Sequence, residues 1–210
     1  MTRTPEGYAQ NVFINCPFDT HYKPLFDSIV FTVQLAGFTP RCALEASNAG
    51  QARLYKIIDI IGECRYGIHD ISRTELSRSR LPRFNMPLEL GLDLGCRHYG
   101  KAWRSDKRLL VMDRSLYRYQ KFVSDIAGQD VVSHSNSIRQ IIRHVRDWLS
   151  TESKIPTIPG GQHIYQRYSA FQKVQPHLCK AMKLDREQLT FGDLSAVIRV
   201  WLEEDDHNKN

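Results

Sequence analysis

Apolar residues along most of the chain alternate between short unbroken runs and longer stretches with helical spacing. The short runs predict strands, because a strand that is buried on both faces is apolar at successive positions. The longer stretches predict amphipathic helices, since their apolar residues recur every three or four positions. The predicted strands are 12–14, 38–44, 66–71, 107–112 and 131–132. The predicted helices of this part are 23–36, 53–64, 86–99, 117–126 and 138–149.

This alternation is typical of consecutive βαβ units and a parallel sheet. We therefore expect an α/β fold, with an open five-stranded, mostly parallel sheet in the flavodoxin-like order 2-1-3-4-5. Residues 1–153 are expected to form this domain. Residues 154–161 hold two prolines and two glycines and predict a linker. Residues 162–210 predict a C-terminal helical hairpin as an appendage, with helices near 165–182 and 188–203.

The net charge of +6 permits a polyanionic partner but does not require one. Much of the excess lies at 73–83, where four arginines face one glutamate, Glu75. This stretch has two open interpretations, a solvated loop and a loop that faces phosphate. Nucleic acid is not the expected partner, because the chain has no helix-turn-helix or RNP-type signature.

The five cysteines are odd in number and form no C-x-x-C pair, so neither a disulfide framework nor a metal site is expected. No apolar run approaches the roughly 20 residues that span a bilayer. The first ten residues are polar and do not resemble a signal peptide. We therefore expect a cytoplasmic protein with no membrane partner.

Polar residues follow several predicted strands, and parallel sheets bind ligands beyond the carboxyl ends of their strands. The ends at 15–19, 44–50, 70–73 and 113–114 should meet at one edge of the sheet. This convergence predicts a ligand site. The expected substrate-binding residues are Asn15, Cys16, Pro17, Phe18, Asp19, Asp70, Ser72, Arg73, Phe84 and Asn85.

Glu89 is the best candidate for chemistry, because it opens a predicted helix close to that edge. A carboxylate in the first helical turn interacts favourably with the helix dipole and is expected to stay ionised. The alternative is that Glu89 only charges the helix start. Asp93, one turn later, is expected at the surface, and His69 is expected to be a hydrogen-bonded core or edge histidine. The chain lacks the G-x-G-x-x-G, P-loop, G-x-S-x-G and H-E-x-x-H motifs.

Residues 12–148 resemble the TIR-like and nucleoside-deoxyribosyltransferase-like group of flavodoxin-type domains. The resemblance rests on V-F-I-N at 12–15, I-H-D-I-S at 68–72, and E-L-G-L-D-L-G at 89–95 followed by G-K at 100–101. Asn15 and Cys16 stand where TIR domains usually have a serine. In both families an early glutamate of the corresponding helix is the catalytic residue.

The resemblance implies that Glu89 helps to break the bond between a ribose and its base. The transition state of such a reaction is oxocarbenium-like, and an anionic carboxylate stabilises or captures it. NAD is the implied substrate, with no separate cofactor, because its nicotinamide is already cationic. The basic residues at 73–83 would hold the pyrophosphate. Phe18 or Phe84 would stack on the base, although each is equally compatible with a place in the core.

Three functions thus remain open. The first is a TIR-like NAD glycohydrolase or nucleotide-signal generator, as in bacterial anti-phage defence. The second is a nucleoside or nucleotide N-glycosidase or deoxyribosyltransferase. The third is a TIR-type module that binds nucleotides or proteins without catalysis. The expected partners are a nucleotide and further copies of the chain, with the C-terminal helices as the candidate contact.

Overall fold

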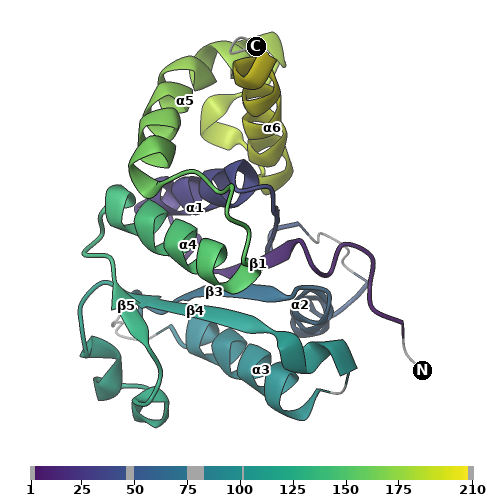
Figure 1. The fold of residues 1–210 in the computed structure, drawn as a ribbon, viewed down its shortest axis with the longest axis vertical. Helices are drawn as coiled ribbons and strands as arrows, with labels where there is room; N and C mark the ends of the chain where they lie inside the picture. Colours follow the sequence, from purple (N-terminus) through teal and green to yellow (C-terminus); the bar gives the residue numbers. More distant parts are fainter. Residues whose placement is uncertain (1–2, 46–49, 75–82, 101, 208–210) are drawn as a thin grey trace.

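The computed structural model describes residues 3–45, 50–74, 83–100 and 102–207, without the side chains of residues 102 and 206. Its strands form one parallel sheet in the order β2-β1-β3-β4-β5, which confirms the predicted topology (Figure 1). The strands are β1 (Asn11–Asn15), β2 (Thr39–Arg41), β3 (Tyr66–Asp70), β4 (Arg108–Asp113) and β5 (Val131–Ser133). All residues of β1 and β3 are buried, as expected for central strands covered on both faces.

Helices cover both faces of this sheet (Figure 1). They are α1 (Lys23–Leu35), α2 (Arg53–Gly62), α3 (Asn85–Tyr99), α4 (Ile138–Ser153), α5 (Gly161–Ala181) and α6 (Phe191–His207). Helices α1 and α4 pack side by side on one face, whereas α2 and α3 pack on the other. The predicted α/β class with C-terminal helices is therefore confirmed. Within the described ranges, no helix is long and apolar enough to cross a membrane.

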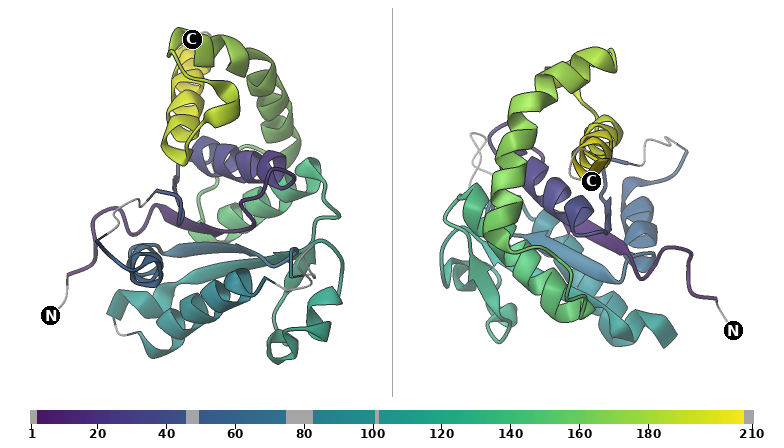
Figure 2. Two further views of the ribbon diagram at one scale, coloured as in Figure 1. Left: turned by 180° about the vertical axis from the view of Figure 1, so that it is seen from behind. Right: turned by 45° about the horizontal axis from the view of Figure 1, so that its top comes forward.

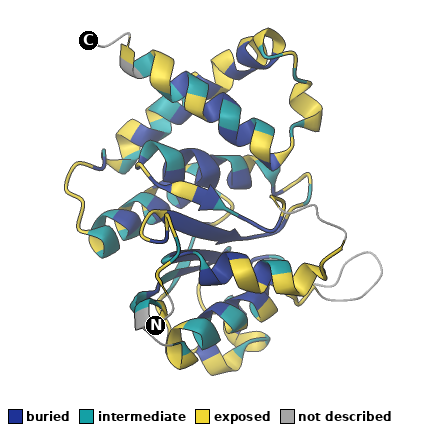
Figure 3. Cartoon of the chain, turned by 90° about the vertical axis from the view of Figure 1, so that its right-hand side faces the viewer, coloured by how far each residue is buried: buried dark blue, intermediate teal, exposed yellow. Residues whose placement is uncertain are grey.

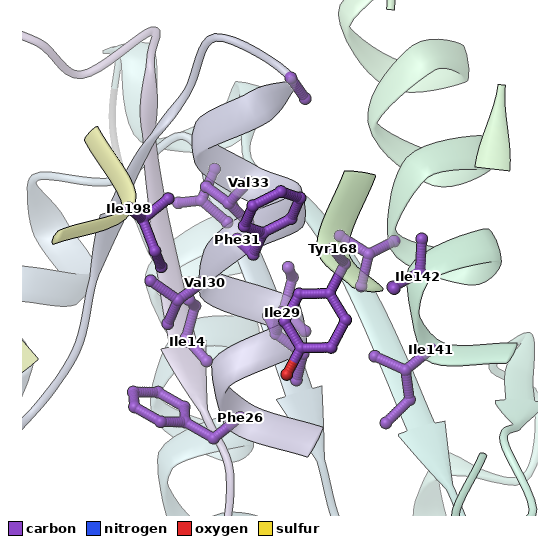
Figure 4. Packing of buried hydrophobic residues seen from close by; sticks show 14 of the residues in the cluster. Ile14, Phe26, Ile29, Val30, Phe31, Val33, Ile141, Ile142, Tyr168 and Ile198 are labelled. Atoms are coloured by element: carbon purple, nitrogen blue, oxygen red, sulfur yellow. The ribbon is translucent and has the colours of Figure 1, made fainter. Parts of the chain in front are cut away.

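Helices α5 and α6 form a further layer outside α1, as the views in Figure 2 show. Their aromatic side chains surround Phe31 of α1, whose ring centroid lies 5.3 Å from those of Tyr168 and Phe171 and 5.6 Å from that of Trp201. Figure 4 shows Tyr168 and Ile198 packed with α1 residues in this core. The two C-terminal helices therefore share one hydrophobic core with the sheet, and the proposed division at 154–161 stays a prediction.

Two elements differ from those predicted from the sequence. The segment 117–126 is not one helix but two short 3-10 helices, η2 (Arg118–Lys121) and η3 (Ser124–Ile126). Tyr117 has a φ of 58°, a left-handed conformation that prevents a continuous helix from starting there. Strand β2 is shorter than predicted and contains Pro40, which has no N–H to donate and suits an edge strand.

The other short helices are η1 (Ala102–Asp106) and η4 (Arg186–Gln188). Figure 3 shows the strands buried between the helical layers, with the exposed residues on the outer sides of the helices. The chain leaves β1, β3 and β4 at the same edge of the sheet, because these strands are parallel. This carboxyl edge is where the predicted site residues fall.

Candidate functional site

The sequence predicted that Glu89 lies in the first turn of its helix. In the structure Glu89 lies in the second turn of α3. The helix begins at Asn85, because the Phe84 carbonyl already accepts a hydrogen bond from the Leu88 N–H at 2.9 Å, and its first turn holds no acidic residue. The Glu89 side chain is only 8% exposed. Its Oε2 atom is buried and has no hydrogen-bond partner among the described residues. This oxygen is therefore a buried acceptor that no described group uses.

Burial raises the pKa of Glu89 to about 7, even though the positive charge of Arg53 acts to lower it. The expectation that Glu89 stays fully ionised is therefore wrong: removal from water outweighs the favourable charges. Burial also raises the pKa of the Cys16 and Cys42 thiols, and the Glu89 charge adds to both shifts. Glu89 thus lies close to the ends of β1 and β2 and to Arg53, the first residue of α2.

Asn15, at the end of β1, points into the protein and not toward solvent. It is 2% exposed, and its Nδ2 lies 3.0 Å from His69 Nδ1 and donates to the Met86 carbonyl of α3 at 2.8 Å. Both amide hydrogens are therefore used within the protein. Its expected role in substrate binding has no support from this geometry.

His69, Asp93 and Lys107 form a fully buried polar group between the sheet and α3. His69 Nε2 lies 3.0 Å from Asp93 Oδ2, and Lys107 Nζ lies 3.1 Å from Asp93 Oδ1. The expectation that His69 is a hydrogen-bonded core histidine is confirmed. The expectation that Asp93 lies at the surface is wrong, because two buried partners stabilise its carboxylate there.

Asp70 is also fully buried, and its carboxylate has two hydrogen-bond donors and a histidine beside it. Its carboxylate lies 3.0 Å from His134 Nε2, accepts a 2.8 Å bond from the Ser72 N–H, and accepts a short bond from the Tyr22 hydroxyl. Burial alone would raise the pKa of Asp70, but His134, Tyr22 and Ser72 together hold it below its usual value. Asp70 therefore joins β3 to neighbouring segments inside the protein.

Asp19 links the loops that follow β1 and β3. It accepts a 3.1 Å bond from the Tyr22 N–H before α1, and the guanidinium groups of Arg73 and Arg83 each lie 3.9 Å from its carboxylate. Two cations of the basic stretch therefore lie close to the carboxyl edge. Residues 75–82, which include Glu75, Arg78 and Arg80, lie outside the described residues.

Of the two aromatic residues expected to stack on a base, Phe18 is the one that lies beside a hollow. It is 37% exposed and packs edge-on against Phe26, with ring centroids 5.4 Å apart. The hollow has a volume of about 250 Å³, and Pro17, Phe18 and Asp19 contribute to its wall. An exposed aromatic edge next to an acidic and a basic loop can accept a base or another planar group.

The remaining predicted residues are divided between core and surface. Cys16, Pro17 and Ser72 are buried, and the Ser72 hydroxyl has no hydrogen-bond partner within the described part of the chain. Phe84 is 56% exposed and Asn85 is exposed beside it, at the start of α3. The structure therefore brings Cys16 close to Glu89 and groups Asp19 with Arg73, while Phe84 and Asn85 face solvent.

Sequence reasoning did not identify Tyr22, Arg53, Lys107 or His134 as parts of this region. Lys107 is separated from Asp93 by a helix end and a 3-10 helix, so no local spacing connects them. One usable signal was Gly67, since a glycine inside a strand often marks a close approach by another segment. In 3–45, 50–74, 83–100 and 102–207, no three His, Cys, Asp or Glu side chains gather as a metal ion would require.

Comparisons with known proteins give no relative from which a function could be taken. This chain matched no profile of a known protein family, no curated protein and no solved structure. Its function has to be inferred from the residues of the site.

Proposed function

We propose that this protein cleaves the N-glycosidic bond of a nucleotide, with Glu89 as the catalytic carboxylate and the nicotinamide–ribose bond of NAD as the target. The observation that carries the proposal is the buried Glu89 carboxylate at the carboxyl edge, with Oε2 unpartnered among the described residues. A carboxylate held in this way stabilises an oxocarbenium-like transition state, or captures its anomeric carbon. The resemblance of residues 12–148 to TIR-like domains supports the same assignment.

NAD suits a site with one carboxylate, because its leaving group needs no proton. The C1′–N bond breaks, and its electron pair neutralises the nicotinamide. Water then adds to C1′ and releases a proton, which gives ADP-ribose; attack by a nitrogen of the same nucleotide would give a cyclic signal instead. Arg73 and Arg83, both close to Asp19, would bind the pyrophosphate, and Phe18 would stack on the base.

The raised pKa of Glu89, about 7, favours one further candidate. A neutral base leaves poorly unless it is protonated, and a carboxyl group that is partly protonated near neutral pH can donate that proton. A nucleoside or nucleotide N-glycosidase, or a deoxyribosyltransferase, is therefore the second candidate. Assembly into a homo-oligomer and a role in bacterial defence are parts of the first proposal that rest on the resemblance alone, and a cytoplasmic location rests on the expectation from the sequence.

The test is an incubation of the purified protein with NAD and a panel of nucleosides and nucleotides, read by chromatography. Glu89→Gln is the test variant, and Glu204→Gln on the exposed side of α6 is the matched control. Release of nicotinamide that is lost only in Glu89→Gln would support the first candidate, and release of another base the second. Equal turnover by Glu89→Gln would exclude Glu89 as the catalytic group. Binding of a nucleotide with no turnover would favour a non-enzymatic module.

A further inference from the structure

Four buried side chains connect the end of β1 to the end of α2 through α3. We call them the α3 anchor: Asn15, His69, Asp93 and Lys107. Because Asn15 donates to His69 Nδ1, the neutral imidazole carries its proton on Nε2 and donates it to Asp93. Lys107 Nζ donates to the carbonyls of Ile61, at 2.7 Å, and Cys64, and it forms an ion pair with Asp93 Oδ1 at 3.1 Å. The amide hydrogens of Asn15 and the ring N–H of His69 therefore all have acceptors within the protein.

The anchor holds α3 at two points that lie on either side of Glu89. The first is the Met86 carbonyl, which accepts from Asn15, and the second is the Asp93 carboxylate. Met86 precedes Glu89 by three residues and Asp93 follows it by four, so all three share one face of the helix. These residues are also among those that α3 buries. The orientation of the Glu89 side chain is thus set by the two turns that the anchor fixes.

We propose that the α3 anchor positions Glu89 for catalysis, with Asn15 as a positioning residue that acts through the first turn of α3. This role rests on the proposed function of Glu89. It also explains why a polar residue at the end of β1 directs both amide hydrogens into the protein. Loss of the Asn15–Met86 bond frees the start of α3, and water then reaches the Glu89 carboxylate.

The pKa of Glu89 depends on how far its carboxylate is buried, so a titration of Glu89 reports on the position of its side chain. The titratable groups identified around it are Arg53 of α2, Cys16 after β1 and Cys42 after β2. Burial is the largest influence on the pKa of Glu89 and raises it to about 7. Solvation of the carboxylate should therefore move the pKa toward the value of an exposed glutamate, roughly 4.3.

The experiment compares Asn15→Ala with Asn11→Ala. Asn11 lies on the same strand, is 5% exposed and donates its Nδ2 to the Glu63 carbonyl at 2.9 Å, at the end of β1 away from Glu89. The two variants should lose similar stability. The Glu89 pKa is measured by carbon-13 NMR of labelled glutamate carboxyl groups, with the Glu89 signal assigned by its loss in Glu89→Gln.

Asn15→Ala is expected to lower the Glu89 pKa by about one pH unit or more and to reduce kcat about tenfold with little change in KM. Asn11→Ala should change neither quantity. An unchanged Glu89 pKa in a folded Asn15→Ala protein, or equal shifts in both variants, would overturn the proposal. Asn15→Ser is measured in its place if the alanine variant does not fold. Because NMR needs no turnover, an inactive wild-type protein would count against the proposed function and leave the positioning result readable.

Discussion

Gly67 of β3 and Asp93 of α3 meet at a point where a side chain on residue 67 does not fit, because a Cβ there would overlap Asp93 Oδ2. We expect Gly67→Ala to lower the free energy of unfolding by about 1–3 kcal/mol, the usual cost of overpacking a buried site. Urea denaturation measures this change. Gly91→Ala on α3 is the control, since a Cβ there meets nothing within 4 Å, and it should be neutral or stabilising. A Gly67→Ala protein as stable as wild type would contradict this packing.

Removing one partner of the ion pair between Asp93 and Lys107 should destabilise the protein much more than removing both partners. Both side chains are fully buried, so Lys107→Met leaves the Asp93 charge without its cation. We expect a loss of about 3–5 kcal/mol in the free energy of unfolding. The double variant Asp93→Asn with Lys107→Met should recover part of this loss, because neither charge remains. Equal denaturation midpoints for the single and double variants would show that the pair is not coupled.

Glu89 should make the protein less stable as the pH rises. Its folded pKa of about 7 lies above that of an unfolded glutamate, so the folded state binds this proton more tightly. The resulting stability is fully present below about pH 4 and is lost as the pH rises through 7. Glu89→Gln does not titrate, so it should gain up to about 3 kcal/mol relative to wild type between pH 5 and pH 8. Denaturation curves at both pH values test this, and a constant difference would contradict it.

The pH dependence of turnover should distinguish the two proposed reactions. Cleavage of NAD needs the ionised carboxylate, so its rate should rise with pH through the pKa of Glu89, about 7 in the free protein. Cleavage of a neutral nucleoside needs the protonated acid and should fall over the same range. Profiles of kcat/KM for both substrates provide the measurement. A flat profile for each would show that Glu89 takes no part in a rate-limiting step.

Asp70 should contribute to stability above its depressed pKa. Asp70→Asn places an amide donor or a weaker acceptor against Tyr22 and His134, and we expect a loss of about 3 kcal/mol at pH 7. The partners of Asp70 outweigh the effect of burial, so its pKa in the folded protein is below its unfolded value. The stability that Asp70 contributes is therefore present above about pH 4 and is lost as the pH falls through the folded pKa. The difference between the variant and wild type should therefore shrink at pH 3. Wild-type kinetics in a folded variant would assign Asp70 a structural role alone.

The topology of the sheet could be predicted because it depends on the pattern of apolar residues along the chain. The apolar spacing of α1 and the buried runs of β1 and β3 are local properties, and parallel order follows from the alternation of strands and helices. The segment 117–126 was predicted wrongly because the left-handed Tyr117 carries no sequence signal. A tyrosine rarely adopts this conformation.

The interior of the site could not be predicted in the same way. Aspartate is usually a surface residue, and only the contacts of Asp93 with His69 and Lys107 make its burial favourable. His69 lies on β3 and Lys107 lies just before β4, so the pairing with Asp93 of α3 depends on the finished fold. The protonation of Glu89 likewise depends on how much water the surrounding segments exclude.

Helix α1 has no exposed position from Leu25 to Val33, and all of these residues except Asp27 are buried, since the sheet covers one side and α5 and α6 cover the other. During synthesis, α1 leaves the ribosome long before Trp201 is made, and its apolar outer side then has no cover. The α/β part therefore cannot complete its packing before α6 has been made. We expect the outer side of α1 to be exposed to association with other chains until α5 and α6 have been made.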